Sequence, residues 1–94
     1  MRIVIVDDHP VVRQGVQQTL SMQEDMQVVG IAGSYSEGVD VIVSLKPDVA
    51  ILDMKIPGGS GLEIIRKVRN EVPECRFVIL TSYASPQNIS GAVS

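Results

Sequence analysis

Four short apolar runs are the feature that most limits how this chain can fold. They cover residues 2–6, 26–34, 48–53 and 76–82. The first run, RIVIV, is apolar on both faces, which is typical of a strand that is covered on both sides. Such strands belong to parallel sheets, whose successive strands are joined by long and usually helical crossovers. The runs therefore predict a parallel sheet with helices between the strands.

The segment after the first run has the pattern of an amphipathic helix from about Pro10 to Met22. Proline suits the first turn of a helix, and three apolar residues fall on one face at a spacing of four: Val12, Val16 and Leu20. Residues 36–45 are ambiguous, because some of their apolar residues alternate as in a strand while others have helical spacing. Topology favours a helix there, since the strands on either side need a crossover.

The third connecting segment carries its own helix-start signal. Ser60 and Glu63 have the spacing of a capping box, and the helix they begin should stop before Pro73. Its expected apolar stripe consists of Leu62, Ile65, Val68 and Val72. A fourth helix is expected to begin at Ser85 and Pro86. This repeated alternation predicts a doubly wound α/β fold.

Composition indicates one soluble globular domain. The 94 residues are 45% hydrophobic and 20% charged, a balance typical of a folded domain with one modest core. The net charge of −3 is spread over interspersed acids and bases, so the chain has no basic stripe for direct contact with nucleic acid.

The single cysteine and the first residues indicate where such a chain would work. Cys75 lies in a polar connection and has no second cysteine to pair with, which favours a reducing compartment. The first apolar run is too short for a signal peptide or a membrane span. We therefore expect a cytoplasmic location.

Polar residues stand where three of the four runs end. In a doubly wound fold, ligands bind outside the carboxyl ends of the strands. The residues brought to that edge are Asp7, Asp8, Asp53, Thr81 and Ser82. Three carboxylates in one place repel one another and need a compensating cation, and a small set of oxygen ligands suits Mg²⁺.

Carboxylates beside Mg²⁺ indicate phosphoryl chemistry, in which an aspartate can itself be the nucleophile. Asp53 is the candidate acceptor, because it stands alone at the end of its strand before a glycine-rich loop. Asp7 and Asp8 are adjacent, as expected for a pair that holds the metal.

These residues carry a resemblance to a known family. The stretches IVDDHPVVRQGV and LDMKIPGGSGLE, with the strand-end LTS, resemble a response-regulator receiver domain of bacterial two-component systems, of the NarL/FixJ (LuxR-type) family. The resemblance covers the whole chain and implies a flavodoxin-like receiver fold. It also implies a phosphoprotein in signal transduction, which accepts a phosphoryl group from a sensor histidine kinase. Such a protein is not an enzyme beyond Mg²⁺-dependent self-phosphorylation from a donor and slow self-dephosphorylation.

The resemblance assigns roles at the strand edge. Asp53 would be the phosphoacceptor. Asp8, Asp53 and the backbone carbonyl of Lys55 would ligate Mg²⁺, while Asp7 would act through a metal-bound water. The remaining two assignments are a switch hydroxyl that turns toward the phosphoryl group and a small neighbour that leaves room for the donor: Thr81 and Ser82.

Receiver domains also have a fifth strand ending in a lysine, followed by a fifth helix. The chain stops before both, so we expect a receiver domain over residues 1–94 that lacks them and carries no output domain. Lys46 and Lys67 are expected on helices facing away from the site. The fourth strand would be an unpaired apolar edge, which predicts self-association. In the parent family a helix-turn-helix output domain binds promoter DNA, so DNA binding would belong to that domain.

Other interpretations of the same residues are open. Asp8 could only cap the first helix, Asp53 could be an Asx-turn residue, and Thr81 could only favour a strand. Pro57 and the glycines after it indicate a turn, and His9 is expected to be a surface residue.

Two other classes of function are also open. An aspartate-nucleophile phosphatase of the haloacid dehalogenase kind also combines Mg²⁺ with an aspartate on an α/β sheet, but its nucleophile follows the first strand in a D-x-D pattern. A receiver-like interaction module would bind partners without being phosphorylated.

Overall fold

The predicted parallel sheet is present in the computed structural model, which describes residues 1–80. The strands lie in the order β2-β1-β3-β6 and every neighbouring pair is parallel, with the bounds β1 Arg2–Val6, β2 Gln27–Ala32, β3 Val49–Asp53 and β6 Arg76–Leu80. This is the strand order of flavodoxin-like doubly wound folds. It places the carboxyl ends of β1 and β3 side by side.

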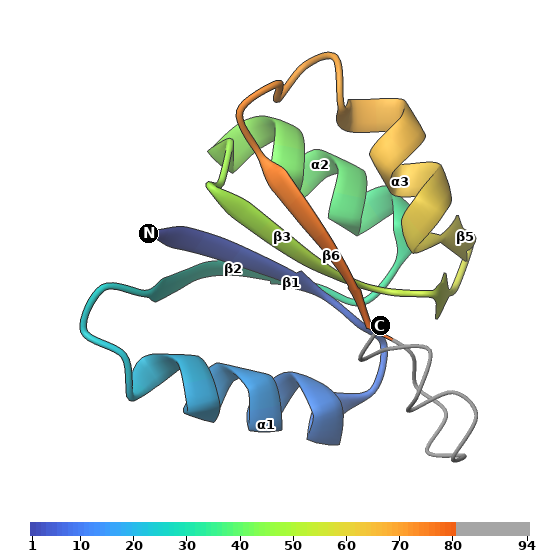
Figure 1. Cartoon of the computed structure of the whole chain (residues 1–94). Helices are drawn as coiled ribbons and strands as arrows, with labels where there is room; N and C mark the ends of the chain where they lie inside the picture. Colours follow the sequence, from blue (N-terminus) through green and yellow to red (C-terminus); the bar gives the residue numbers. More distant parts are fainter. Residues whose placement is uncertain (81–94) are drawn as a thin grey trace.

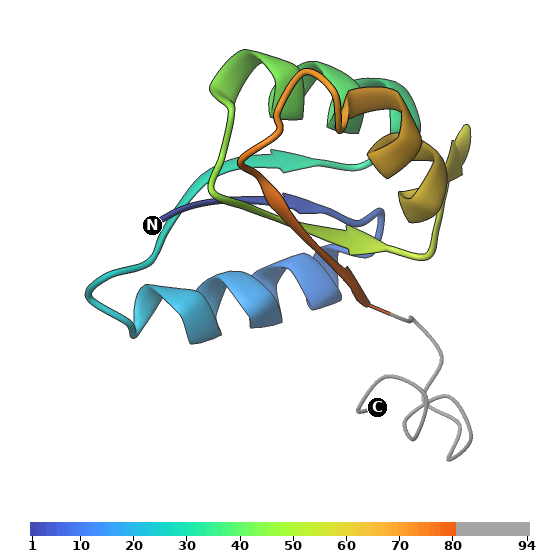
Figure 2. The same ribbon diagram turned by 45° about the horizontal axis from the view of Figure 1, so that its top comes forward.

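Helices cover both faces of the sheet. Their bounds are α1 Pro10–Ser21, α2 Tyr35–Leu45 and α3 Gly61–Val68. One face is covered by α1 and the other by α2 and α3, as the two views show (Figures 1 and 2). The helix predicted for the ambiguous segment 36–45 is confirmed as α2. Of the helices in the described part of the chain, none is long and apolar enough to cross a membrane.

Side-chain caps begin two of the helices. At the start of α3, Ser60 Oγ accepts the backbone N–H of Glu63 at 3.2 Å, so the cap predicted from their spacing is confirmed. Ser34 makes the equivalent bond to Glu37 at the start of α2. Each cap satisfies a backbone donor that a helix leaves free at its first turn, and so fixes where the helix begins relative to the strand before it.

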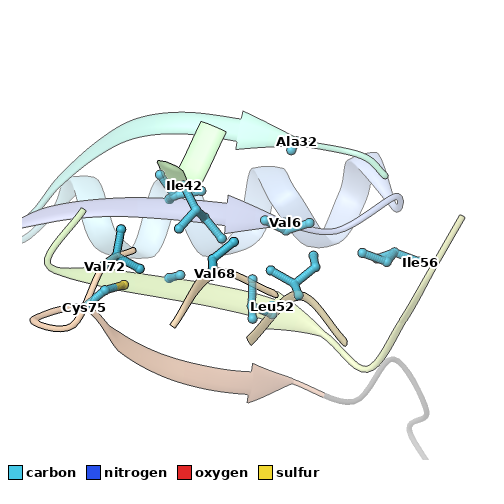
Figure 3. Packing of buried hydrophobic residues seen from close by; sticks show 11 residues of the cluster. Val6, Ala32, Ile42, Leu52, Ile56, Val68, Val72 and Cys75 are labelled. Atoms are coloured by element: carbon cyan, nitrogen blue, oxygen red, sulfur yellow. The ribbon is translucent and has the colours of Figure 1, made fainter. Parts of the chain in front are cut away.

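The main core lies between the sheet and the pair α2 and α3. Figure 3 shows its side chains, which include Val6, Ala32, Ile42, Leu52, Ile56, Val68, Val72 and Cys75. Cys75, which the sequence placed in a polar connection, is buried at one end of this core. Burial raises the pKa of its thiol, so Cys75 packs as a small apolar side chain rather than as a reactive one.

The opposite face of the sheet has a thinner cover. Ile3 and Ile5 are buried, and side chains alternate along a strand, so they lie on the face away from Val4 and Val6. The helix on that face, α1, has no buried residue, and its predicted stripe of Val12, Val16 and Leu20 is only half-buried.

The apolar face predicted for α3 was partly wrong. Ile64 and Val68 are fully buried, whereas Leu62 is 49% exposed and Ile65 is half-buried. The buried face of α3 is therefore rotated relative to the predicted one. The reason is Gly61, where a Cβ would lie 2.6 Å from the carbonyl oxygen of Asp53. The helix therefore approaches β3 through Gly61, and Ile64, three residues on, faces the core. The helix α3 ends at Val68, and hydrogen-bonded turns connect it to Val72.

A short hairpin that the sequence did not predict follows β3. Its strands are β4 Lys55–Ile56 and β5 Gly59–Ser60. Gly58 has a φ of +89°, a conformation that favours glycine, so the turn expected here is confirmed. The backbone N–H of Tyr35 donates to the Pro57 carbonyl at 2.9 Å, which ties the loop after Asp53 to the start of α2.

Candidate functional site

Three carboxylates converge at the carboxyl edge of the sheet, as predicted. Asp53 ends β3, while Asp7 and Asp8 directly follow β1, which is its parallel neighbour. One oxygen from each carboxylate and a ring nitrogen of His9 all lie within 4.8 Å of one another. Adjacent strands therefore deliver four potential ligand atoms to one small volume.

Asp53 lies at the bottom of this cluster. It is 1% exposed, and neither carboxylate oxygen has a hydrogen-bond partner among the described residues. Burial raises the pKa of Asp53, and the nearby charge of Asp7 raises it further. Burying an unpartnered carboxylate costs free energy of folding. A bound cation would offset this cost. The backbone N–H groups of Met54 and Lys55 lower the pKa of Asp53 in part, so the interpretation of Asp53 as an Asx-turn residue stays open.

Asp7 is held in place by the backbone that follows it. It is 2% exposed, and its Oδ1 accepts the backbone N–H of His9 at 2.7 Å. Its own backbone N–H donates to the carbonyl of Ala32 at 2.9 Å, which ties the β1 loop to the end of β2. Asp7 therefore presents its carboxylate from a fixed position.

Asp8 lies at the mouth of the cluster, with its side chain 35% exposed. The N-cap of α1 is His9, and no side chain makes a capping bond there. The interpretation of Asp8 as a helix cap alone is therefore wrong. Its carboxylate, whose Oδ1 lies 3.1 Å from His9 Nδ1, is half-exposed and lies beside Asp7 and Asp53.

His9 is the residue that sequence reasoning missed. Half of the side chain is exposed, as expected for a surface residue, but Nδ1 lies 3.0 Å from Asp7 Oδ1, 3.1 Å from Asp8 Oδ1 and 3.6 Å from Asp53 Oδ2. The hydrogen bond with Asp7 and the charge of Asp8 raise the pKa of His9. The sequence signal for His9 at the site was its position directly after the acidic pair. The direction of its ring, however, depends on the conformation of the loop between β1 and α1.

The donor set fits Mg²⁺. Hard carboxylate oxygens in small number are its usual protein ligands, and the unpartnered oxygens of Asp53 leave that residue able to coordinate it. Lys55, whose carbonyl is the predicted additional ligand, lies two residues beyond Asp53 in β4. That role stays a prediction.

Thr81 and Ser82, the predicted switch hydroxyl and its small neighbour, lie outside the described residues. The last residue of β6, Leu80, nevertheless lies beside the site. Leu80 pairs with Asp53 in the sheet, and its carbonyl accepts the backbone N–H of Met54 at 3.0 Å.

The comparisons with known proteins identify the family. Residues 3–94 match the family model described as response regulator receiver domain, and the chain belongs to that family. This membership excludes the haloacid dehalogenase alternative and sets the chain apart from enzymes that act on separate substrates.

Its relatives are transcriptional regulators of the NarL type. The chain is 39% identical over 93 residues to the DNA-binding transcriptional activator DevR/DosR of Mycobacterium tuberculosis, covering 99% of this chain and 43% of that protein. It is 40% identical over 79 residues to the nitrate/nitrite response regulator NarL of Escherichia coli K12, covering 84% of this chain and 37% of that protein. The chain thus spans about two-fifths of the length of these relatives.

Solved receiver domains share the fold. The signal receiver domain of the response regulator NarL from Mycobacterium tuberculosis superposes with a TM-score of 0.82 at 33% identity, covering 98% of this chain and 74% of that one. The isolated receiver domain of RcsB from Salmonella enterica, solved with phosphomimetic BeF₃⁻, gives a TM-score of 0.80 at 28% identity, covering 99% of this chain and 70% of that one. The flavodoxin-like receiver fold expected from the sequence is confirmed.

Proposed function

We propose that Asp53 accepts a phosphoryl group from a sensor histidine kinase in a Mg²⁺-dependent reaction. The observation that carries the proposal is the Asp53 carboxylate, which is buried at the sheet edge with both oxygens unpartnered. A solvent-excluded carboxylate of this kind is poised to react once its charge is compensated.

Transfer of the phosphoryl group depends mainly on the positions of the reacting groups and on charge neutralisation. A carboxylate oxygen of Asp53 attacks the phosphorus of a phosphohistidine whose other ring nitrogen carries a proton, the P–N bond breaks, and the ring leaves as neutral imidazole as the acyl phosphate forms. When bound, Mg²⁺ supplies the charge neutralisation that this transfer requires. Asp8, Asp53 and the Lys55 carbonyl would hold it, and the buried carboxylate of Asp7 would orient its water.

The phosphoryl group would control an output elsewhere in a longer protein. Relatives of this chain are DNA-binding transcriptional regulators, and this chain has a net charge of −3 and no basic stripe. We therefore place promoter binding in an output domain rather than in this segment. A cytoplasmic location is part of the proposal and follows from the lone cysteine.

We also propose self-association through β6. In the described part of the chain β6 is an edge of the sheet, and Val78 on it is 46% exposed. An apolar strand edge is a template for pairing with a second copy.

Intact mass after incubation with Mg²⁺ and acetyl phosphate tests the central step, because acetyl phosphate replaces the kinase as donor. We expect a phosphoryl adduct on the wild-type chain, none on Asp53→Asn and none on the wild type in EDTA. An adduct on Asp53→Asn, or no adduct on a wild-type sample that circular dichroism shows to be folded, would contradict the proposal.

The second outcome would favour the alternative function of a receiver-like interaction module. One observation favours that alternative: among residues 1–80 the contacts of these carboxylates at ion-pair distance are with His9, and no lysine makes one. The role of the family's lysine would then have to be supplied from outside the described residues.

A further inference from the structure

The loop that follows Asp53, residues 54–60, contains the hairpin of β4 and β5. We propose that Tyr35, the first residue of α2, is a positioning residue that holds this loop and, through it, the backbone beside the phosphoacceptor. The inference rests on the proposed function, since the reaction that it concerns is the phosphorylation of Asp53. Nothing in the sequence pattern distinguished Tyr35 as a residue of the site.

The packing of Tyr35 on the loop explains the second of two adjacent glycines. Gly58 has a φ of +89°, which accounts for the choice of glycine at that position. Gly59 does not have a positive φ, but a Cβ on it would lie 2.9 Å from Tyr35 Cδ2 and 3.2 Å from Tyr35 Cγ. The half-buried ring therefore packs directly on the backbone of Gly59, and a larger residue there would displace the ring.

A hydrogen bond joins the same two segments through the backbone. The N–H of Tyr35 donates to the carbonyl of Pro57 at 2.9 Å. This N–H belongs to the first turn of α2, where backbone donors have no partner within the helix, and the cap formed by Ser34 and Glu37 fixes that turn. The loop is therefore attached to the start of α2 at two points, by the ring on Gly59 and by the bond to Pro57.

The hairpin connects this attachment to the backbone beside Asp53. Gly59 pairs with Ile56 in the antiparallel hairpin, and Ile56 is buried in the core. The residues between Ile56 and the phosphoacceptor are Met54 and Lys55, whose backbone N–H groups lower the pKa of Asp53 in part. The backbone of the loop therefore faces the carboxylate, and its position depends on how the hairpin is held.

Phosphoryl transfer is sensitive to small displacements of this backbone. Catalysis of this reaction consists mainly of positioning and electrostatic stabilisation, and a misplacement of about 1 Å can cost on the order of 100-fold in rate. Removing the ring would leave a space beside Gly59, and the loop would be held to α2 by the bond to Pro57 alone. We therefore expect Tyr35→Ala to slow phosphorylation of Asp53 beyond any effect of lower stability.

The rate of adduct formation from acetyl phosphate, followed by intact mass at saturating Mg²⁺, tests this role. We expect Tyr35→Ala to lower the rate constant at least about tenfold, whereas Tyr35→Phe, which keeps the ring and the backbone N–H, should retain the wild-type value. Each variant is studied at a temperature where circular dichroism shows it to be folded.

Val68→Ala is the matched control for a loss of stability alone. Val68 is fully buried and is the last residue of α3, at the opposite end of that helix from the loop. Its truncation should lower the Tm and leave the rate constant unchanged. A wild-type rate in Tyr35→Ala, or an equal loss of rate in Val68→Ala, would overturn the proposal.

A double-variant cycle tests the contact itself without metal or donor. Gly59→Ala places a methyl group against the ring of Tyr35 and should lower the Tm. In the Tyr35→Ala background the ring is absent, so the same substitution should lower the Tm by less. Equal shifts in the two backgrounds would show that the ring does not pack on Gly59 and would overturn the proposal.

Failure of the proposed function is seen separately. No adduct on folded wild-type protein would reject the proposed function and, with it, the role of Tyr35. An adduct on the wild type that forms equally fast on Tyr35→Ala would retain the function and reject only the role of Tyr35.

Discussion

Replacing Asp53 with asparagine should stabilise the metal-free fold. The carboxylate oxygens of Asp7 and Asp53 contribute to a cluster within 4.8 Å, so at an effective dielectric constant of about 20 their repulsion is at least about 3.5 kcal/mol. His9, half-exposed and 3.6 Å from Asp53, offsets part of this, and the asparagine amide still lacks partners. We expect a net gain of about 2 kcal/mol in the free energy of unfolding.

Thermal unfolding in EDTA at neutral pH measures this gain. For a domain of this size about 2 kcal/mol raises the Tm by on the order of 10 °C. Saturating Mg²⁺ should shrink the difference, because it stabilises the wild type by binding and Asp53→Asn has lost a ligand. An unchanged or lower Tm for Asp53→Asn in EDTA would refute the argument that Asp53 is an uncompensated buried charge.

The pH dependence has a definite sign. Burial raises the pKa of Asp53 in the folded state, so the folded state binds a proton more readily than the unfolded one. The cost of the charge is fully present above the folded pKa and is relieved as the pH falls through it toward the unfolded value. The stability difference between Asp53→Asn and the wild type should therefore narrow on acidification through this window, and a widening difference would contradict the assignment.

Three further predictions concern the frame around the site. Gly61→Ala should lower the free energy of unfolding by about 2 kcal/mol or more in denaturant titrations, because its Cβ would lie 2.6 Å from the Asp53 carbonyl oxygen; an unchanged midpoint would show that α3 can shift freely. Ser60→Ala should cost about 1 kcal/mol in the same assay through loss of the cap on Glu63, whereas no loss would mean that another group caps the helix. Val78→Lys should reduce self-association in light scattering, since a lysine on an exposed edge disfavours strand pairing, and an equal apparent mass would place the contact elsewhere.

The sequence predicted the strands and their order of connection well because each strand is a continuous apolar run. The site followed from the same pattern, since parallel strands must end at a common edge and the acids stand at those ends. For α2, periodicity was ambiguous and the need for a crossover decided the assignment. These predictions depended on topology, which the order of apolar runs already limits.

The predictions that failed concern residues whose positions depend on close contacts in the folded structure. The buried face of α3 is set by the approach of Gly61 to β3, a steric constraint that helical periodicity does not contain. The inward position of His9 depends on the loop bond to Asp7 and on Pro10. Cys75 lies in a polar stretch of sequence but is buried in the core, where its backbone N–H donates to the Val72 carbonyl at 3.0 Å.

The most direct test of the central claim is to locate the phosphoryl group on the chain. After treatment with acetyl phosphate and Mg²⁺, borohydride reduces an aspartyl phosphate to homoserine, which tandem mass spectrometry of peptides can place. The account predicts homoserine at position 53, only in samples that contained both Mg²⁺ and the donor. Homoserine at Asp7 or Asp8, or an unmodified Asp53 in folded protein, would contradict it.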